Sequence, residues 1–463
     1  MDMNRRQFLG TLAAGTAAVA GCTSKKEEEL KDEYTSQIEP PKGKMTYRTN
    51  PTTKDKVSIL GYGMMRLPYR KGDKEKGEPD EVINQEQVNK LVDYAMAHGV
   101  NYYDTSPAYC QGHSEESTGI ALSRYKRSDY FVATKLSNFS PETWSREKSI
   151  EMYHNSMKYL QVDYIDYYLL HAIGMGGMES LNGRYIDNGI LDYLVEERKA
   201  GRIRNLGFSY HGDIKVFDYL LSQHDKYHWD FVQIELNYLD WNFADEMSSS
   251  NTDAVYLYGE LVKRGIPAVI MEPLLGGRLA NLPRFLVEKM KERNAKGSVA
   301  SWAFRYAGTP EGVLTVLSGM TYMEHLVDNL LTYCPLKPID KEEDEFLQYV
   351  ARQIVNMQTV PCTNCKYCMP CPYGVNIPAI FVHYNKCKNE GTLPMDATSA
   401  DYSRLRRQYL ISFDRNIEKL RQPQHCIGCG ECMSHCPQGI RIPEQLQKID
   451  KFINELKKGQ EIS

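Results

Sequence analysis

The chain has 463 residues, 42% of them hydrophobic, which is enough for two or three domains with sizeable cores. A formal net charge of −4 and scattered Lys and Arg residues argue against a nucleic-acid partner or a polybasic membrane surface. The twelve cysteines do not indicate a disulfide scaffold, because eight of them fall in two short runs near the C-terminus.

The first residues have the features of an export signal. Arg5 and Arg6 precede an apolar run of about fourteen residues, shorter than the roughly twenty of a spanning helix. The arginine pair resembles the twin-arginine signal, and residues 19–22 (VAGC) resemble a lipobox in which Cys22 becomes lipidated. The alternative is a chance cysteine after a cleaved signal. We expect a signal peptide over 1–22, a flexible tether over 23–44 and a place in the cell envelope, in the periplasm or as a membrane-anchored lipoprotein.

Short apolar runs then alternate with amphipathic stretches, such as Val88, Leu91, Val92 and Ala95 at helical spacing. Eight such alternations predict an α/β fold, a (β/α)8 TIM barrel over 45–335, followed by a helical linker over 336–358. A doubly wound open sheet is the alternative. The expected strands are 57–61, 100–104, 130–134, 164–170, 203–208, 230–235, 266–271 and 313–318.

Polar residues follow the ends of the second, third and fourth expected strands. Asp104 ends the second, Tyr109 lies in the loop after it, Lys135 follows the third and His171 follows the fourth. Asp104 could hold Lys135, whose ammonium would lower the pKa of Tyr109 and help it protonate an alkoxide. A neutral His171 could donate a hydrogen bond to the substrate oxygen. The four side chains therefore predict carbonyl reduction at the C-terminal rim of the barrel.

The segments that carry these residues have a familiar pattern. Residues 101–106 (NYYDTS), 133–135 (ATK), 169–171 (LLH) and 201–209 (GRIRNLGFS) resemble the aldo-keto reductase signature, within a similarity from about 45 to 329. The resemblance implies that a nicotinamide nucleotide donates hydride and that the catalytic tetrad is Asp104, Tyr109, Lys135 and His171.

The resemblance also implies contacts with the nucleotide. Ser209 and Gln233 match positions that contact the nicotinamide amide, although Tyr210 stands where the family usually has an asparagine. Gly276 and Gly277 could hold the pyrophosphate, because glycines allow close backbone approach.

Residues 318–329 match the segment that binds the adenosine phosphate, with Gly319 and Asn329 as contacts. Gly319 and His325 replace the basic residues with which many relatives bind a 2′-phosphate. Either NADP or NAD is therefore expected as the cofactor.

Two runs of four cysteines, each ending in Cys-Pro, lie in residues 359–463. The second run has the ferredoxin spacing, in which three thiolates bind one [4Fe–4S] cluster and the fourth binds the other cluster. Zinc is the alternative, but its sites usually pair C-x2-C units across a longer gap. We predict a mainly helical, ferredoxin-like domain with two [4Fe–4S] clusters, one held by Cys362, Cys365, Cys368 and Cys436 and the other by Cys371, Cys426, Cys429 and Cys432.

Two functions remain open from the residues. The first is an enzyme that reduces a small carbonyl, or oxidises an alcohol, with clusters that could exchange electrons with a partner protein. The second is an exported electron-transfer or iron–sulfur-binding protein whose barrel is a scaffold without ordinary turnover. No nucleic-acid partner is expected, and the expected membrane contact is the lipid anchor.

Overall fold

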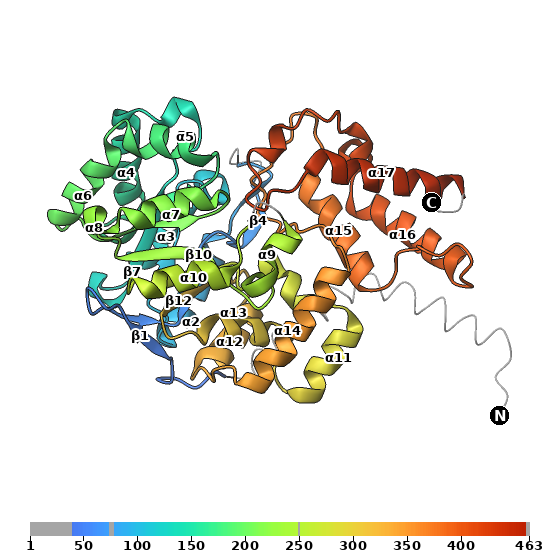
Figure 1. Cartoon of the computed structure of the whole chain (residues 1–463), viewed down its shortest axis with the longest axis horizontal. Helices are drawn as coiled ribbons and strands as arrows, with labels where there is room; N and C mark the ends of the chain where they lie inside the picture. Colours follow the sequence, from blue (N-terminus) through green and yellow to red (C-terminus); the bar gives the residue numbers. More distant parts are fainter. Residues whose placement is uncertain (1–38, 74–77, 249–250, 460–463) are drawn as a thin grey trace.

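The computed structural model describes residues 39–73, 78–248 and 251–459. The expected signal peptide, Cys22 and most of the tether lie outside these residues. The barrel and the helices that cover it, up to residue 358, lie beside a smaller helical region formed by residues 359–459 (Figure 1).

Eight parallel strands close into a barrel, so the open-sheet alternative is wrong. Around the barrel, each strand pairs with its neighbours in chain order, and the last strand pairs with the first. The strands are β3 (Leu60–Gly63), β6 (Tyr102–Asp104), β7 (Phe131–Leu136), β8 (Ile165–Ile173), β9 (Ile203–Tyr210), β10 (Phe231–Glu235), β11 (Ala268–Met271) and β12 (Val313–Ser318).

The first expected strand, 57–61, combines parts of two elements. Residues up to Ser58 belong to β2 (Lys56–Ser58), which pairs antiparallel with β1 (Tyr47–Thr49), and the barrel strand β3 begins only at Leu60. Both short segments are apolar and buried, so one continuous apolar run conceals the break between them.

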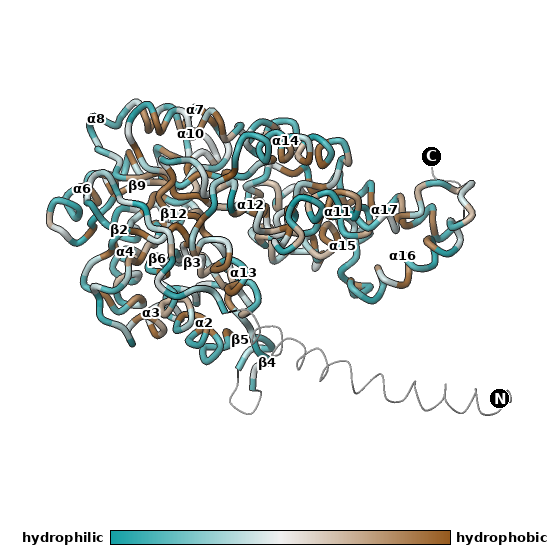
Figure 2. Tube along the Cα trace, turned by 90° about the horizontal axis from the view of Figure 1, so that it is seen from below, coloured by the Kyte–Doolittle hydropathy of each residue, from teal (hydrophilic) through white to brown (hydrophobic). Residues whose placement is uncertain are grey.

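Helices surround the barrel because each carries one apolar face. The residues expected to be buried on 85–97, Val88, Leu91, Val92 and Ala95, are buried. Figure 2 shows hydrophilic residues along outer helices such as α6 and α8. The helices between strands are α2 (Gln85–Ala97), α3 (Ser114–Leu122), α4 (Arg146–Leu160), α5 (Gly177–Leu181), α6 (Ile190–Lys199), α7 (Ile214–Ser222), α8 (His224–Tyr227), α9 (Asp240–Met247), α10 (Ala254–Lys263), α11 (Arg284–Arg293) and α12 (Val299–Gly308), with α13 (Met323–Tyr333) after the last strand. A hairpin of β4 (Tyr69–Lys71) and β5 (Glu81–Ile83) precedes α2.

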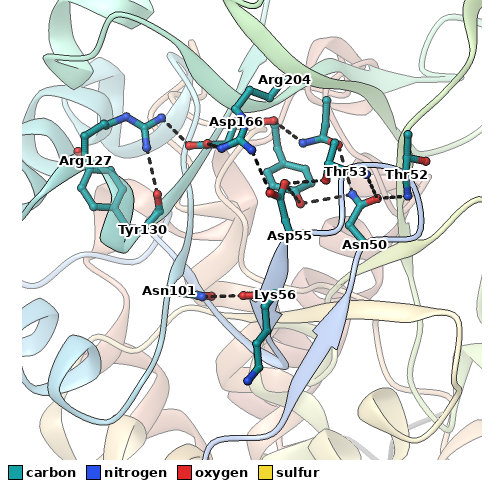
Figure 3. Close-up of polar contacts among 12 residues, drawn as sticks. Asn50, Thr52, Thr53, Asp55, Lys56, Asn101, Arg127, Tyr130, Asp166 and Arg204 are labelled. Atoms are coloured by element: carbon teal, nitrogen blue, oxygen red, sulfur yellow. Dashed lines mark hydrogen bonds and ion pairs between the residues drawn. The ribbon is translucent and has the colours of Figure 1, made fainter.

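A polar network closes the end of the barrel where the strands begin (Figure 3). Asp55, in the β1–β2 turn, accepts hydrogen bonds from Arg204 at 3.0 Å and from the Tyr167 hydroxyl at 3.3 Å. Asp166 bridges Arg127 and Arg204 at 2.5 and 3.3 Å. This end is therefore built for stability, which leaves the opposite rim for chemistry.

The segment expected as a linker packs against the barrel. Its helix α14 (Lys341–Asn356) starts with a capping box between Asp340 and Glu343, and it buries Leu347 and Val350 in the main core. Arg305 donates to both carboxylate oxygens of Glu343, which fixes the helix to α12. The helix is amphipathic, and the barrel covers its apolar face.

Residues 359–459 form a mainly helical unit with its own core. The helices α15 (Ile377–Asn389), α16 (Tyr402–Asn416) and α17 (Ile442–Lys458) pack around buried residues such as Phe381, Tyr409 and Leu446. Among the described helices, none is both long and apolar enough to cross a bilayer.

Candidate functional site

A cavity of ≈ 660 Å³ opens at the rim where the barrel strands end. Asp104, Tyr109 and His171 line one end, and Gly319 and Asn329 line the other. Residues from seven of the eight barrel strands therefore face one space. Its place agrees with the rule that barrel chemistry lies at the carboxyl ends of the strands.

Lys135 and Asp104 form a buried ion pair beside this cavity. Lys135 Nζ lies 2.6 Å from Asp104 Oδ1 and 2.7 Å from the Thr105 carbonyl oxygen. The second carboxylate oxygen of Asp104 is buried without a hydrogen-bond partner in the described structure. Burial lowers the pKa of Lys135 and raises that of Asp104, and their contact opposes both changes.

Tyr109 packs against this ion pair. Lys135 Nζ lies 4.7 Å from the centre of its ring, and the rings of Tyr109 and His171 meet edge to face at 5.9 Å. Burial raises the pKa of Tyr109 well above its ordinary value, and Tyr367 and Asp104 raise it further. The pKa of Tyr109 therefore moves in the direction opposite to the expected one, because burial of the phenol is the largest influence on it. Tyr109 is a neutral phenol that can donate a proton.

His171 lies near the end of β8 with one ring nitrogen engaged. Its Nδ1 lies 2.6 Å from Ser137 Oγ and 3.3 Å from Ser106 Oγ. Burial lowers its pKa well below the ordinary value, and nearby Lys135 and Arg184 lower it further. The imidazole is therefore neutral. When Nδ1 accepts from a serine, Nε2 carries the proton and can donate to a ligand.

Arg184 and Tyr185 hold the histidine backbone in place. Arg184 Nη2 donates to the His171 carbonyl at 2.7 Å, and the Tyr185 hydroxyl accepts from the His171 amide at 3.0 Å. Arg184 and Tyr185 were not expected as site residues, because no motif in the sequence marks the segment that follows β8.

Two of the expected nicotinamide contacts line the middle of the cavity. Gln233 Oε1 is buried with no hydrogen-bond partner in the described structure, which suits an amide donor from a ligand. Ser209 Oγ accepts from the Ala172 amide at 2.8 Å and can still donate. Tyr210 turns elsewhere, because its hydroxyl donates to the Gly212 carbonyl at 2.5 Å.

The far end of the cavity carries acidic side chains. Gly319 and Asn329 line it as expected, together with Glu324, His325 and Asp328. Asn329 Nδ2 donates to Ser318 Oγ at 2.9 Å. Burial lowers the pKa of His325, so this imidazole carries no charge at neutral pH. Arg66 packs against Gly319, but its guanidinium donates to the Thr363 carbonyl at 2.8 Å.

Gly276 and Gly277 line the cavity, but Gly276 also has a structural role. Both have positive φ angles, +64° and +97°. A Cβ on Gly276 would lie 1.9 Å from the Thr363 carbonyl oxygen, and Arg66 Nη2 donates to that same oxygen at 2.8 Å. The glycine turn thus fits against the first cysteine run. Glu272, whose pKa burial raises to about 7, accepts from the Gly276 amide.

The eight clustered cysteines gather in two sets. The thiols of one set lie close enough to raise one another's pKa beyond the effect of burial: Cys362, Cys365, Cys368 and Cys436. The pKa of Cys432 is raised in the same way by Cys371, Cys426 and Cys429. Both sets match the crossed pattern of a two-cluster ferredoxin. None of the described cysteines forms a disulfide.

The first set forms part of the cavity wall. Cys365 and Tyr367 line the cavity opposite the barrel residues. The Tyr367 ring lies 6.4 Å from that of Phe139, which in turn lies 4.9 Å from the His171 ring. A hydrogen-bond contact joins the hydroxyls of Tyr367 and Tyr109. Tyr367 could not be identified from the sequence, because the ends of the barrel strands give no information about residues of a second domain.

Gln438 fixes the other side of this domain contact. It donates to Glu235 Oε1 at 2.9 Å and accepts from Asn251 at 3.0 Å, and Ser248 donates to its carbonyl at 2.7 Å. His211 Nδ1 lies 3.3 Å from the same Glu235 oxygen. The residues next to Cys436 are therefore tied to the cavity lining.

Two family models match the chain. The model of the aldo/keto reductase family matches residues 59–345, and that of the 4Fe-4S dicluster domain matches residues 361–441. L-galactose dehydrogenase of Arabidopsis thaliana is 24% identical over 307 residues, covering 62% of this chain and 88% of that protein. Protein tas of Escherichia coli is 29% identical over 211 residues, covering 39% of this chain and 57% of that protein.

Solved structures show the same barrel. An aldo-keto reductase of Bacillus halodurans superposes with a TM-score of 0.50 at 22% identity, over 66% of this chain and 96% of that one. An aldo-keto reductase of Klebsiella pneumoniae, solved with NADPH, gives a TM-score of 0.50 at 19% identity over the same shares. The family model covers more than half of the chain, and the barrel has the fold of both structures.

Proposed function

The chain belongs to the aldo/keto reductase family and is an oxidoreductase of that type, and we propose that it reduces small carbonyl compounds with Tyr109 as the acid. The observation that carries the proposal is the convergence of Asp104, Tyr109, Lys135 and His171 at one end of one cavity. Alcohol oxidation is the same chemistry in reverse.

His171 and Tyr109 would act on a substrate carbonyl oxygen in different ways. Neutral His171 donates from Nε2 and orients the oxygen, while Tyr109 holds the proton that the developing alkoxide takes. The Lys135–Asp104 pair lies behind the phenol ring and stabilises the phenolate left after transfer. The raised pKa of Tyr109 keeps the phenol protonated at neutral pH, which is the form that carbonyl reduction requires.

The cavity suits a nicotinamide nucleotide as the source of hydride. The unpartnered oxygen of Gln233 and the hydroxyl of Ser209 would hold the carboxamide, and Gly319 and Asn329 would lie at the adenosine end. Glu324 and Asp328 line that end, His325 is neutral, and Arg66 already donates to the Thr363 carbonyl, so a 2′-phosphate would meet more acidic than available basic groups there. We therefore propose NAD as the preferred cofactor over NADP.

The dicluster domain would supply one-electron chemistry beside this site. We propose two [4Fe–4S] clusters, held by the two cysteine sets described above. The hydride carries both electrons of the proposed carbonyl reduction, so that step itself draws no electron from the clusters.

One feature of the cavity favours the scaffold function instead. Glu235 and Glu272 line its middle, and Arg66 is engaged by the Thr363 carbonyl. Carboxylates beside a pyrophosphate would weaken nucleotide binding. The second candidate is therefore an iron–sulfur electron-transfer protein whose barrel no longer binds a nucleotide.

Fluorescence titration of anaerobically purified, cluster-replete protein with NADH and NADPH separates the two functions. The enzyme proposal predicts saturable binding, tighter for NADH, and weaker binding in a Gln233→Leu variant. If neither nucleotide binds protein whose iron content is complete, the reductase proposal fails and the scaffold function stands.

A further inference from the structure

Glu115 is a buried acidic residue that the proposed reaction does not yet use. It lies in the first turn of α3 and is only 2% exposed. Thr134 Oγ1 donates to its Oε1 at 2.5 Å, and Thr134 directly precedes Lys135 on β7. The carboxyl group is therefore bonded to the strand that carries the amine of the catalytic cavity.

The ammonium of Lys135 is balanced by two acidic residues. Burial lowers the pKa of Lys135, and first Asp104, at 2.6 Å, and then Glu115 oppose this change through their charges. Lys135 Nζ also lies 4.7 Å from the centre of the Tyr109 ring. The net charge beside Tyr109 therefore depends on whether Glu115 carries a proton.

Glu115 also fixes the segment that carries Tyr109. The turn Tyr109–Gly112 leads directly into α3, which begins at Ser114. Ser114 Oγ lies 2.7 Å from Thr105 Oγ1 and donates to the Met64 carbonyl at 2.7 Å. The bond from Thr134 to Glu115 thus ties the helix that follows the Tyr109 turn to the strand that carries Lys135.

Solvent protons can reach Glu115 without passing through the catalytic cavity. A groove of ≈ 290 Å³ lies between α4 and the start of α3, and Glu115 lines it together with Lys148, Glu151 and Asn155. The side chains of Lys135 and Asp104 are 0% and 3% exposed. Glu115 is therefore placed between the groove and the buried ion pair.

The groups that face Glu115 come from α4, β7 and β8. Burial raises the pKa of Glu115 to about 7, while contacts with Thr134 and Ser156 and the charge of Lys135 oppose the rise. Tyr168 of β8 is a neutral phenol, because burial raises its pKa well above the ordinary value and Glu115 raises it further. Lys148, which lines the groove with Glu151, donates to the Glu142 carbonyl at 2.7 Å.

We propose that Glu115 is a positioning residue for carbonyl reduction, which holds the charge of Lys135 together with Asp104 and exchanges its own proton through the groove. The inference rests on the proposed reductase function. Ionised Glu115 keeps the buried ammonium protonated, so Lys135 can stabilise the phenolate that Tyr109 becomes when it gives its proton to the alkoxide. This support matters above neutral pH, where a buried amine otherwise loses its proton.

The kcat/KM profile against pH tests the proposal in cluster-replete protein, with NADH and a panel of small aldehydes. The test variant is Glu115→Gln, whose side-chain oxygen can accept the same bond from Thr134 without a charge. The control is Glu116→Gln, which removes the neighbouring exposed carboxylate of α3. Iron content and cluster absorbance verify that each variant is loaded.

Below about pH 7 the wild type and Glu115→Gln both lack a charge at this position, so we expect values within about twofold. Above it, Lys135 loses its proton earlier in the variant, and kcat/KM should fall about tenfold below the wild type, as for a pKa change of one unit. The control should follow the wild type. A deficit of equal size at every pH, or no deficit, would overturn the proposal.

Infrared titration of the same proteins needs no turnover. The carboxyl band of Glu115, identified by its absence from Glu115→Gln, should disappear near pH 7, and at higher pH in Lys135→Met, which removes the facing ammonium. A band that titrates at the same pH in Lys135→Met would overturn the inference even in an active enzyme. A band that moves in protein that reduces no aldehyde would support the link to Lys135 and refute the reductase function instead.

Discussion

Tyr109 keeps its proton because of where its neighbours lie. Lys135 could favour the phenolate, but Asp104 at 2.6 Å compensates its charge, and burial of the phenol outweighs what remains. Tyr367 raises the pKa further through its contact with the Tyr109 hydroxyl. The pKa of Tyr109, the proposed acid, therefore depends on Tyr367, a residue of the dicluster domain.

Replacing Tyr367 tests this adjustment. Tyr367→Phe keeps the ring beside Phe139 but removes the hydroxyl that raises the pKa of Tyr109. Because Tyr109 acts in its protonated form, a lower pKa means loss of activity at lower pH. We expect the alkaline limb of the kcat/KM profile, measured with NADH and a panel of small aldehydes, to move to lower pH.

The matched control is Tyr373→Phe, which removes an exposed phenol hydroxyl from the same domain. It should leave the alkaline limb unchanged. An unchanged limb in Tyr367→Phe as well would show that this hydroxyl does not influence the acid.

The sequence alone located the barrel half of the site but not the rest. Asp104, Lys135 and His171 could be predicted because parallel strands bring their carboxyl ends to one rim. The direction in which the pKa of Tyr109 changes could not be predicted from the sequence, since it depends on how deeply the side chain is buried. Nor could Tyr367, which reaches the cavity only after the two domains pack together.

Among the elements, the turn Leu275–Ala280 makes the contacts that join the barrel to the dicluster domain. Gly276 contacts the Thr363 backbone, and Arg278 donates to Thr359 Oγ1 at 3.0 Å. Asn389 of α15 donates to the Asn281 carbonyl at 2.8 Å just after the turn. This short segment therefore positions the first cysteine run over the cavity.

Gly276→Ala should disturb that position, with Gly277→Ala as its control. Both alanines suffer the strain of a positive φ, about 1 kcal/mol. Only the first also meets the Thr363 carbonyl, at 1.9 Å, and overpacking costs about 1–3 kcal/mol more. We expect the thermal unfolding midpoint of Gly276→Ala to fall further than that of Gly277→Ala. Equal midpoints would mean that the turn does not hold the domain.

The periodicity of the sequence predicted most elements of the barrel, because each strand is a separate apolar run bounded by polar residues. It failed where two elements share one run, as at Ser58 and Leu60. It also predicted a linker where α14 packs into the main core. The pattern shows that α14 has an apolar face, but not which surface covers it.

For the whole molecule, the expected signal remains a proposal that fractionation of cells can test. We propose that Arg5 and Arg6 direct export of the folded chain and that lipidation of Cys22 anchors it. Cys22→Ala should move the protein from the membrane fraction to the soluble envelope fraction, while Arg5→Lys/Arg6→Lys should retain it in the cytoplasm. Membrane retention of Cys22→Ala would contradict the anchor.

We propose that the two domains form one redox unit, because Cys365, a proposed ligand of the first cluster, and Tyr367 lie in the wall of the large cavity. The second cluster set lies away from that cavity, at the surface. A ligand bound beside Tyr109 should therefore be sensed by one cluster and not by the other.

EPR spectroscopy of the reduced holoprotein, with and without redox-inert 1,4,5,6-tetrahydro-NAD, tests this claim most directly. With the analogue bound, as monitored by fluorescence, the signal of one [4Fe–4S] cluster should shift while the other stays the same. Two unchanged signals at saturation with the analogue would contradict a shared site for the cluster and the catalytic tyrosine.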